Sequence, residues 1–238
     1  MAFDKLLNKK TMGYFVISLL LVSSSNIFSL LFPATWSSNV INMYNYLNSS
    51  VTVLGFLWAL VSGVILANYK IKDFDFNLKY LLGTFVLLLI IIFNFLIIIC
   101  TSILFERNFN IVFPLKWFLL TFTILLAVYS ISFSISLLMK KWVISMVLSV
   151  VAILLPRFIK ALLVNILFFL KIIKPQDIMH KTIINITNHL SLPYYLGFDF
   201  PHRNLQDVNF LLDIPIIFLI SVVIYYLIRR KAKVYFEN

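Results

Sequence analysis

Residues 11–69 read TMGYFVISLLLVSSSNIFSLLFPATWSSNVINMYNYLNSSVTVLGFLWALVSGVILANY, a run of 59 residues without one Asp, Glu, Lys, Arg or His. Three further uncharged runs follow at residues 80–105, 117–139 and 214–228. A helix of about 20 largely apolar residues crosses the roughly 30 Å hydrocarbon core of a bilayer. These runs therefore predict an all-α integral membrane protein that crosses the bilayer several times.

The composition excludes a water-soluble domain. Hydrophobic residues make up 62% of the 238 residues and charged residues 12%, whereas soluble domains carry roughly 25% charged residues. The formal net charge is +11, but no basic patch lies on a soluble domain, so nucleic acid is not an expected partner. The only cysteine, Cys100, lies in an apolar run and has no second cysteine with which to form an intrachain disulfide.

One transmembrane domain over residues 1–238 accounts for the whole chain. We expect residues 1–12 to form an amphipathic helix in the headgroup plane, with Phe3, Leu6 and Leu7 on its apolar face. A frayed basic N-terminus is the alternative. The six spans that follow are expected at about residues 14–33, 51–69, 80–104, 115–139, 142–156 and 208–228.

The number of spans depends on residues 142–173, where Pro156 and Arg157 interrupt an apolar sequence. A separate crossing after these two residues would place the basic N-terminal and C-terminal segments on opposite sides of the membrane. The positive-inside rule favours both segments in the cytoplasm. We therefore predict one crossing at 142–156 and, within residues 157–207, a re-entrant or interfacial segment on the outer side.

Two rows of small residues predict close helix packing. The second span has a residue with a small side chain at every fourth position, which places Gly55, Ala59, Gly63 and Ala67 on one helix face. The neighbouring helix could belong to the same chain or to a second subunit. The fourth span contains four serines, Ser130, Ser132, Ser134 and Ser136. We expect their hydroxyls to bond to the preceding turn within a packed helix rather than to line a water-filled conduit.

The cytoplasmic link between spans two and three, YKIKDFDFNLK at residues 69–79, alternates charged and apolar side chains. Such a segment can form a short amphipathic helix along the membrane and present Phe74 or Phe76 to a groove on a partner. The alternative is a solvated loop whose aromatic rings enter the membrane interface. The candidate coupling residues are Lys70, Ile71, Lys72, Asp73, Phe74, Asp75 and Phe76.

Catalytic and metal-binding patterns are missing from the sequence. There is no G-x-S-x-G, H-E-x-x-H or Walker A motif, and the intervals between His180, His189 and His202 match no compact metal motif. We therefore assign the chain no catalytic residue, metal ligand or cofactor and do not expect an enzyme. Proton and ion relays within a bilayer use ionisable side chains, so the energy for uphill transport would come from a partner.

The arrangement resembles that of the ABC-2 permeases, the membrane subunits of bacterial type-2 ABC exporters. The resemblance covers the whole chain: a basic N-terminal segment, six spans with both ends inside, and a broken segment after the fifth span. It includes the link ANYKIKDFDFNLKYLLGT at residues 67–84 and the tight turn in SISFSISLLMKKWVISMVLSVV at residues 130–151.

The resemblance implies a multi-pass protein of the bacterial plasma membrane that dimerises with a second permease, either the same or a different chain. Two cytoplasmic ABC ATPase subunits would hold the ATP and Mg²⁺, and residues 69–79 would be the coupling element. The cargo would be amphipathic or antimicrobial peptides, or another hydrophobic molecule. Two other classes stay open: a stand-alone immunity or scaffold protein of the membrane, and a substrate-binding membrane component without an ATPase.

Overall fold

Six long helices make up most of the chain that the structure describes. The computed structural model describes residues 9–31, 40–68, 76–105, 111–139, 141–172, 178–179, 181–183 and 210–236. In chain order the long helices are α2 (Lys9–Leu31), α3 (Val40–Asn68), α4 (Phe76–Phe105), α5 (Val112–Met139), α6 (Trp142–Phe169) and α9 (Phe210–Phe236). The predicted all-helical class is confirmed for these residues.

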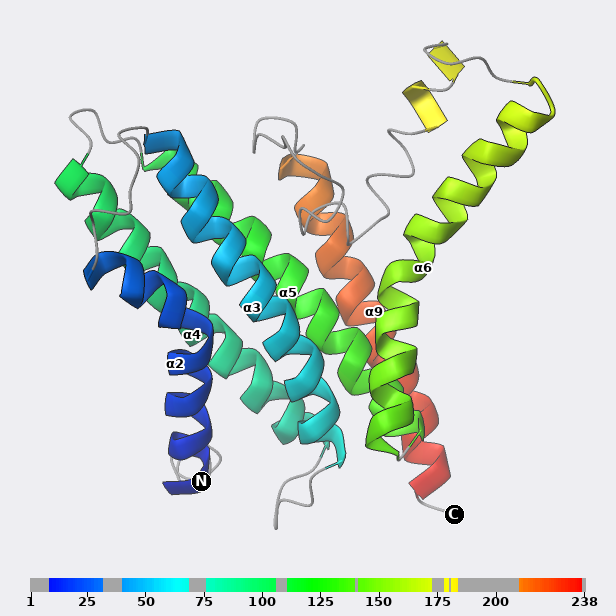
Figure 1. The fold of residues 1–238 in the computed structure, drawn as a ribbon. Coiled ribbons are helices and arrows are strands. Elements are labelled where there is room, and N and C mark those ends of the chain that lie inside the picture. Colours follow the sequence, from blue (N-terminus) through cyan, green and yellow to red (C-terminus); the bar gives the residue numbers. More distant parts are fainter. Residues whose placement is uncertain are drawn as a thin grey trace.

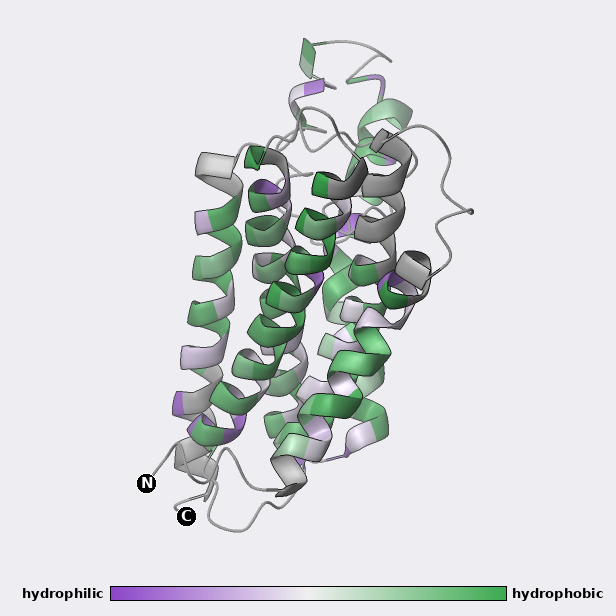
Figure 2. Cartoon of the chain, turned by 90° about the vertical axis from the view of Figure 1, so that its left-hand side faces the viewer, coloured by the Kyte–Doolittle hydropathy of each residue, from purple (hydrophilic) through white to green (hydrophobic). Residues whose placement is uncertain are grey.

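Four of these helices are long and apolar enough to cross a membrane. The segments that meet this criterion are Val51–Asn68, Phe76–Thr101, Pro114–Met139 and Trp142–Phe169. Shorter apolar segments, Met12–Ile27 and Ile214–Leu227, lie in the first and last helices. Apolar residues cover much of the described helices in Figure 2. The protein is thus membrane-embedded, while six crossings and their orientation stay predictions.

The described helices begin or end beyond several predicted spans. For example, α3 begins at Val40 rather than at residue 51, and α9 continues to Phe236 rather than ending at 228. Helical hydrogen bonds join backbone groups four residues apart and do not require apolar side chains, so a helix can continue past its apolar segment. The predicted interfacial helix over residues 1–12 lies outside the described residues up to position 8, and Lys9–Met12 belong to α2.

The helix does not break at Pro156, where the fifth span was predicted to end, because α6 passes through this proline. Where the span itself ends stays a prediction. The sequence after it, RFIKALLVNILFF, is mostly apolar and retains helical hydrogen bonding, and Figure 1 shows the helix axis changing direction along α6. A bend is the usual result of an interior proline. The outer segment predicted for 157–207 therefore begins as part of α6, and most of its later residues lie outside the described ranges.

A left-handed residue ends α6. Lys171 has a φ of 57°, and its N–H donates to the carbonyl of Phe168 at 3.0 Å. The N–H of Ile172 donates to the carbonyl of Leu167 at 3.0 Å. This pair of bonds is the Schellman motif, in which glycine usually occupies the left-handed position.

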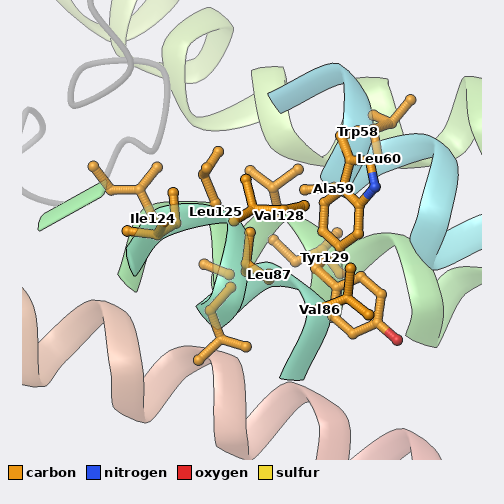
Figure 3. Close-up of a cluster of buried hydrophobic side chains, with 14 of the residues drawn as sticks. Trp58, Ala59, Leu60, Val86, Leu87, Ile124, Leu125, Val128 and Tyr129 are labelled. Carbon is orange, nitrogen blue, oxygen red and sulfur yellow. The ribbon is translucent and has the colours of Figure 1, made fainter. Parts of the chain in front are cut away.

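Helix α5 is the centre of the bundle. It packs against α3, α4, α6 and α9, and 78% of its apolar segment is buried, compared with 18% for α6. In Figure 1, α6 leans away from the other helices along its second half. The core consequently lies around α5, where Figure 3 shows buried side chains from α3, α4 and α5: Trp58, Ala59, Leu60, Val86, Leu87, Ile124, Leu125, Val128 and Tyr129.

The small-residue face of α3 lies against α5 of the same chain. A Cβ atom added at Gly63 would lie 2.8 Å from the backbone N of Phe133 and 2.9 Å from the backbone O of Tyr129. At Gly55 it would lie 2.6 Å from a methyl carbon of Leu125. The other two residues of the stripe, Ala59 and Ala67, are buried. Small side chains therefore allow the two backbones to approach closely, as in other membrane helix pairs.

Replacing Gly63 with Ala tests this contact, with Gly13→Ala as the matched control because a Cβ at Gly13 meets no atom within 4 Å. Alanine favours a helix over glycine by about 1 kcal/mol, but overpacking a filled interface costs about 1–3 kcal/mol. In detergent, we expect the unfolding temperature to stay equal or rise for Gly13→Ala and to fall for Gly63→Ala. Equal unfolding temperatures of the two variants would contradict the α3–α5 contact.

Candidate functional site

The predicted coupling segment joins the end of α3 to the start of α4. Its residues Lys70, Ile71, Lys72, Asp73, Phe74 and Asp75 lie outside the described part of the chain. Phe76 is the first residue of α4, and its half-buried ring packs against the chain's own core. The Nζ atom of Lys79 lies 5.6 Å from the centre of that ring. The described end of the segment is therefore anchored to the bundle.

Lys79 differs from its expected place in a cytoplasmic link. It lies one turn inside α4, is 6% exposed, and is the only charged side chain that is buried among those the structure describes. No group of three or more His, Cys, Asp or Glu side chains that could hold a metal occurs in the described residues. The described core consequently offers hydroxyl, amide and aromatic groups rather than a set of paired charges.

Tyr80 links the start of α4 to α9 and α5. Its ring stacks on that of Tyr225 with centroids 3.9 Å apart. The hydroxyl of Tyr225 donates a hydrogen bond to Oδ1 of Asn77 at 2.8 Å, and the hydroxyl of Tyr80 is 2.7 Å from Oγ of Ser130. We call Asn77, Tyr80, Tyr129, Ser130 and Tyr225 the tyrosine junction. It connects three helices near the start of α4.

Tyr129 forms the buried centre of the tyrosine junction. Its hydroxyl donates long hydrogen bonds to the backbone oxygens of Lys79 (3.3 Å) and Tyr80 (3.4 Å), and its ring stacks near Trp58 at a centroid distance of 6.4 Å. A Cβ at Gly83 would lie 2.2 Å from the Tyr129 hydroxyl, so glycine makes room for the ring. The first turns of α4 therefore cannot shift without changing their contacts with Tyr129 of α5.

A second polar cluster joins α2 to α4 through fully buried side chains. The amide nitrogen of Asn26 donates to Oδ1 of Asn94 at 2.8 Å. The amide nitrogen of Asn94 donates to Oγ of Ser23 and to the carbonyl of Ile90, both at 2.8 Å. An asparagine in an apolar span is costly unless it is hydrogen-bonded, and here two of the partners of Asn94, Ser23 and Asn26, lie on α2. The cluster therefore fixes how α2 packs on α4.

The four serines of α5 are buried, and two of them bond within the helix. Ser130 and Ser132 donate to the carbonyls four residues earlier, at 2.7 and 2.9 Å. Ser136 donates to the carbonyl of Val64 on α3 at 3.3 Å and accepts a hydrogen bond from Asn68. These contacts support the packing interpretation of the serine row for those three residues.

The sequence analysis did not single out the tyrosine junction or the asparagine cluster. An asparagine within an uncharged span, such as Asn94 in IIIFNFLIII, is a usable signal because polar side chains in spans favour the interior of a bundle. Tyrosine carries no such signal, since it is also enriched at membrane surfaces. Tyr225 and its neighbour Tyr226 show the difficulty: the second is 61% exposed, whereas the first stacks on Tyr80.

Replacing Tyr225 with Leu removes one stacked ring and one hydrogen bond, and Tyr226→Leu is the matched control one position further along α9. Aromatic pairs contribute about 0.5–1.5 kcal/mol beyond burial, and a hydrogen bond adds about 1 kcal/mol. We expect a lower unfolding temperature in detergent for Tyr225→Leu and little change for Tyr226→Leu. If Tyr226→Leu lowered the unfolding temperature more than Tyr225→Leu, then Tyr226 rather than Tyr225 would face the bundle.

Replacing Asn94 with Leu tests the asparagine cluster, with Asn165→Leu as the control because Asn165 is an exposed asparagine of α6. Asn94→Leu leaves the buried amide of Asn26 without its partner, which costs about 1–3 kcal/mol. We expect this variant to unfold at a lower temperature than the unmodified protein and Asn165→Leu to match or exceed it. An unchanged Asn94→Leu would mean that the cluster contributes nothing to stability.

The chain was compared with known proteins in three ways. No family model matches the sequence, and no curated protein and no solved structure matches the chain.

Proposed function

We propose that this chain is the permease subunit of an ATP-driven exporter of the ABC-2 type in a bacterial plasma membrane. Cytoplasmic ABC ATPase subunits bind ATP and Mg²⁺ and supply the energy, and a second permease, identical or different, completes the membrane part. The cargo is an amphipathic or antimicrobial peptide or another hydrophobic molecule. The cargo class follows from the resemblance to exporter subunits of similar size.

The main support for the proposal is the attachment of the start of α4. The coupling segment ends at Phe76, whose ring packs on the core. One turn later, Tyr80 contacts Tyr225 of α9 and Ser130 of α5. A partner that pulled on the segment would therefore act on three helices through short contacts, as an ATPase must do to change the shape of a permease.

The scarcity of buried charge also supports an external energy source. Transporters driven by proton or ion gradients place ionisable groups inside their spans. Among the described side chains only Lys79 is both charged and buried, and a single cation beside an aromatic ring is no relay. An ATPase partner would supply what these residues lack.

The first test is whether the adjacent open reading frame encodes a P-loop ATPase, because its absence would remove most of the support for the proposal. If it does, co-purification of that ATPase with this chain is the biochemical test. We expect Phe74→Ala, alone and with Phe76→Ala, to weaken the association by about 30-fold, as the loss of an interface anchor worth about 2 kcal/mol does. The single variant is needed because Phe76 packs on the chain's own core. Phe158→Ala with Phe169→Ala removes two exposed rings from α6 and should leave the association unchanged.

The same experiment separates docking from transmission and from the rival functions. Tyr225→Leu should keep the ATPase bound but lower cargo export, since it alters the tyrosine junction and not the segment. Unchanged association of the Phe74 variants would show that the coupling assignment is wrong. Protection of cells by the chain alone, without nucleotide dependence, would instead identify an immunity or scaffold protein, and small-molecule binding without an ATPase would identify a binding component.

A further inference from the structure

A pocket opens where the end of α3 meets the start of α6. It has a volume of about 460 Å³ and is lined by Asn68, Lys141, Trp142, Val143 and Ile144. Binding sites for small molecules commonly have volumes of about 300–1,000 Å³. The pocket is separate from the tyrosine junction, because none of its lining residues belongs to that group of five.

One side of the pocket is polar. Lys141 is exposed and immediately precedes α6, so its ammonium group can reach an anion. The amide nitrogen of Asn68 donates to the carbonyl of Val64 at 2.9 Å and to Oγ of Ser136. Both amide hydrogens of Asn68 are used in these bonds. Its side-chain oxygen can therefore accept a hydrogen bond from a ligand.

The other side of the pocket is apolar. Trp142, Val143 and Ile144 are 64%, 52% and 44% exposed, and they begin the apolar segment that continues to Phe169. The pocket therefore lies at the boundary between the apolar part of α6 and the polar turn before it. Exposed tryptophan favours the headgroup level of a membrane, where an aromatic ring meets both hydrocarbon and water.

The positive charge at this end of the bundle favours a ligand with negative charge. Lys141 lines the pocket, and α9 ends at the same end of the bundle in Figure 1 with RRKAK at residues 229–233. Arg230 of this sequence is exposed. Clusters of basic residues beside spans attract anionic lipids, and a lipid brings both an anionic headgroup and an acyl chain to the same place.

We infer that the pocket binds the headgroup of one anionic glycerophospholipid of the surrounding membrane. The phosphate pairs with Lys141, a headgroup hydroxyl donates to the side-chain oxygen of Asn68, and an acyl chain lies along Val143 and Ile144. Phosphatidylglycerol has this combination of charge and hydroxyl donors, whereas phosphatidylcholine has no net charge and no donor. The lipid site does not depend on the proposed export function.

Fluorescence quenching by lipids with brominated acyl chains tests the site in the full chain reconstituted in nanodiscs. Quenching of Trp142 is obtained as the difference between the unmodified protein and Trp142→Phe, and it is measured against the mole fraction of brominated phosphatidylglycerol or phosphatidylcholine. We expect phosphatidylglycerol to be preferred about fivefold, the effect of one basic residue near a membrane surface. Lys141→Gln should abolish the preference and Lys141→Arg should keep it.

Lys116→Gln is the matched control, because Lys116 is an exposed lysine near the start of α5, at the opposite end of the bundle. It removes the same charge and should leave the preference intact. Equal quenching by the two lipids, or an equal loss in both glutamine variants, would overturn the site. Displacement of the lipid by millimolar glycerol phosphate would also overturn it and would indicate a soluble phosphate ligand. A loss of ATPase association in Lys141→Gln without a change in lipid preference would overturn it too.

Discussion

The close contact between α3 and α5 is the constraint on which the rest of the bundle depends. Lipid tails are as apolar as leucine side chains, so membrane helices gain little from simply hiding apolar surface from one another. Association depends on fit, and at Gly63 the fit is backbone against backbone, with no room for a methyl group. With α3 held there, α5 is placed at the centre, and α4, α6 and α9 pack on its remaining surface.

Hydrogen bonds then specify how the other helices attach to this pair and to one another. The asparagine cluster joins α2 to α4 through Asn26 and Asn94, both fully buried. The tyrosine junction joins α4 to α5 and α9 through ring stacking and hydroxyl contacts. Unpaired polar groups are costly in hydrocarbon. Each cluster therefore favours one relative position of its helices, because sliding one helix along another would separate the hydrogen-bonded groups. Close packing thus holds α3 against α5, and the two buried polar clusters fix the positions of α2, α4 and α9.

The sequence predicts the helical class, the approximate places of the spans and the small-residue face of α3, because each is a property of composition and spacing. It did not predict the continuation of α6 through Pro156, since a proline followed by Arg157 usually marks a break. It also could not show that Lys171 would take a left-handed conformation that glycine normally occupies. Tyr225 shares a helix face with the buried Ile217 and Ser221, but the sequence alone does not show that this face is the one that packs on the bundle.

The unequal burial of the helices has a mechanical consequence. Displacing α5 would break contacts over a segment that is 78% buried, whereas α6 is 18% buried and leans outward (Figure 1). Under the proposed function, a change imposed at the start of α4 would reach α5 and α9 through the tyrosine junction, and α6 follows α5 in the chain. Among the four long apolar segments, that of α6 is the least buried, so a displacement of α6 would break the fewest contacts within the chain. If the proposed lipid binds at Lys141 and a partner acts on α4 as proposed, the surrounding membrane and the partner would both influence the position of α6.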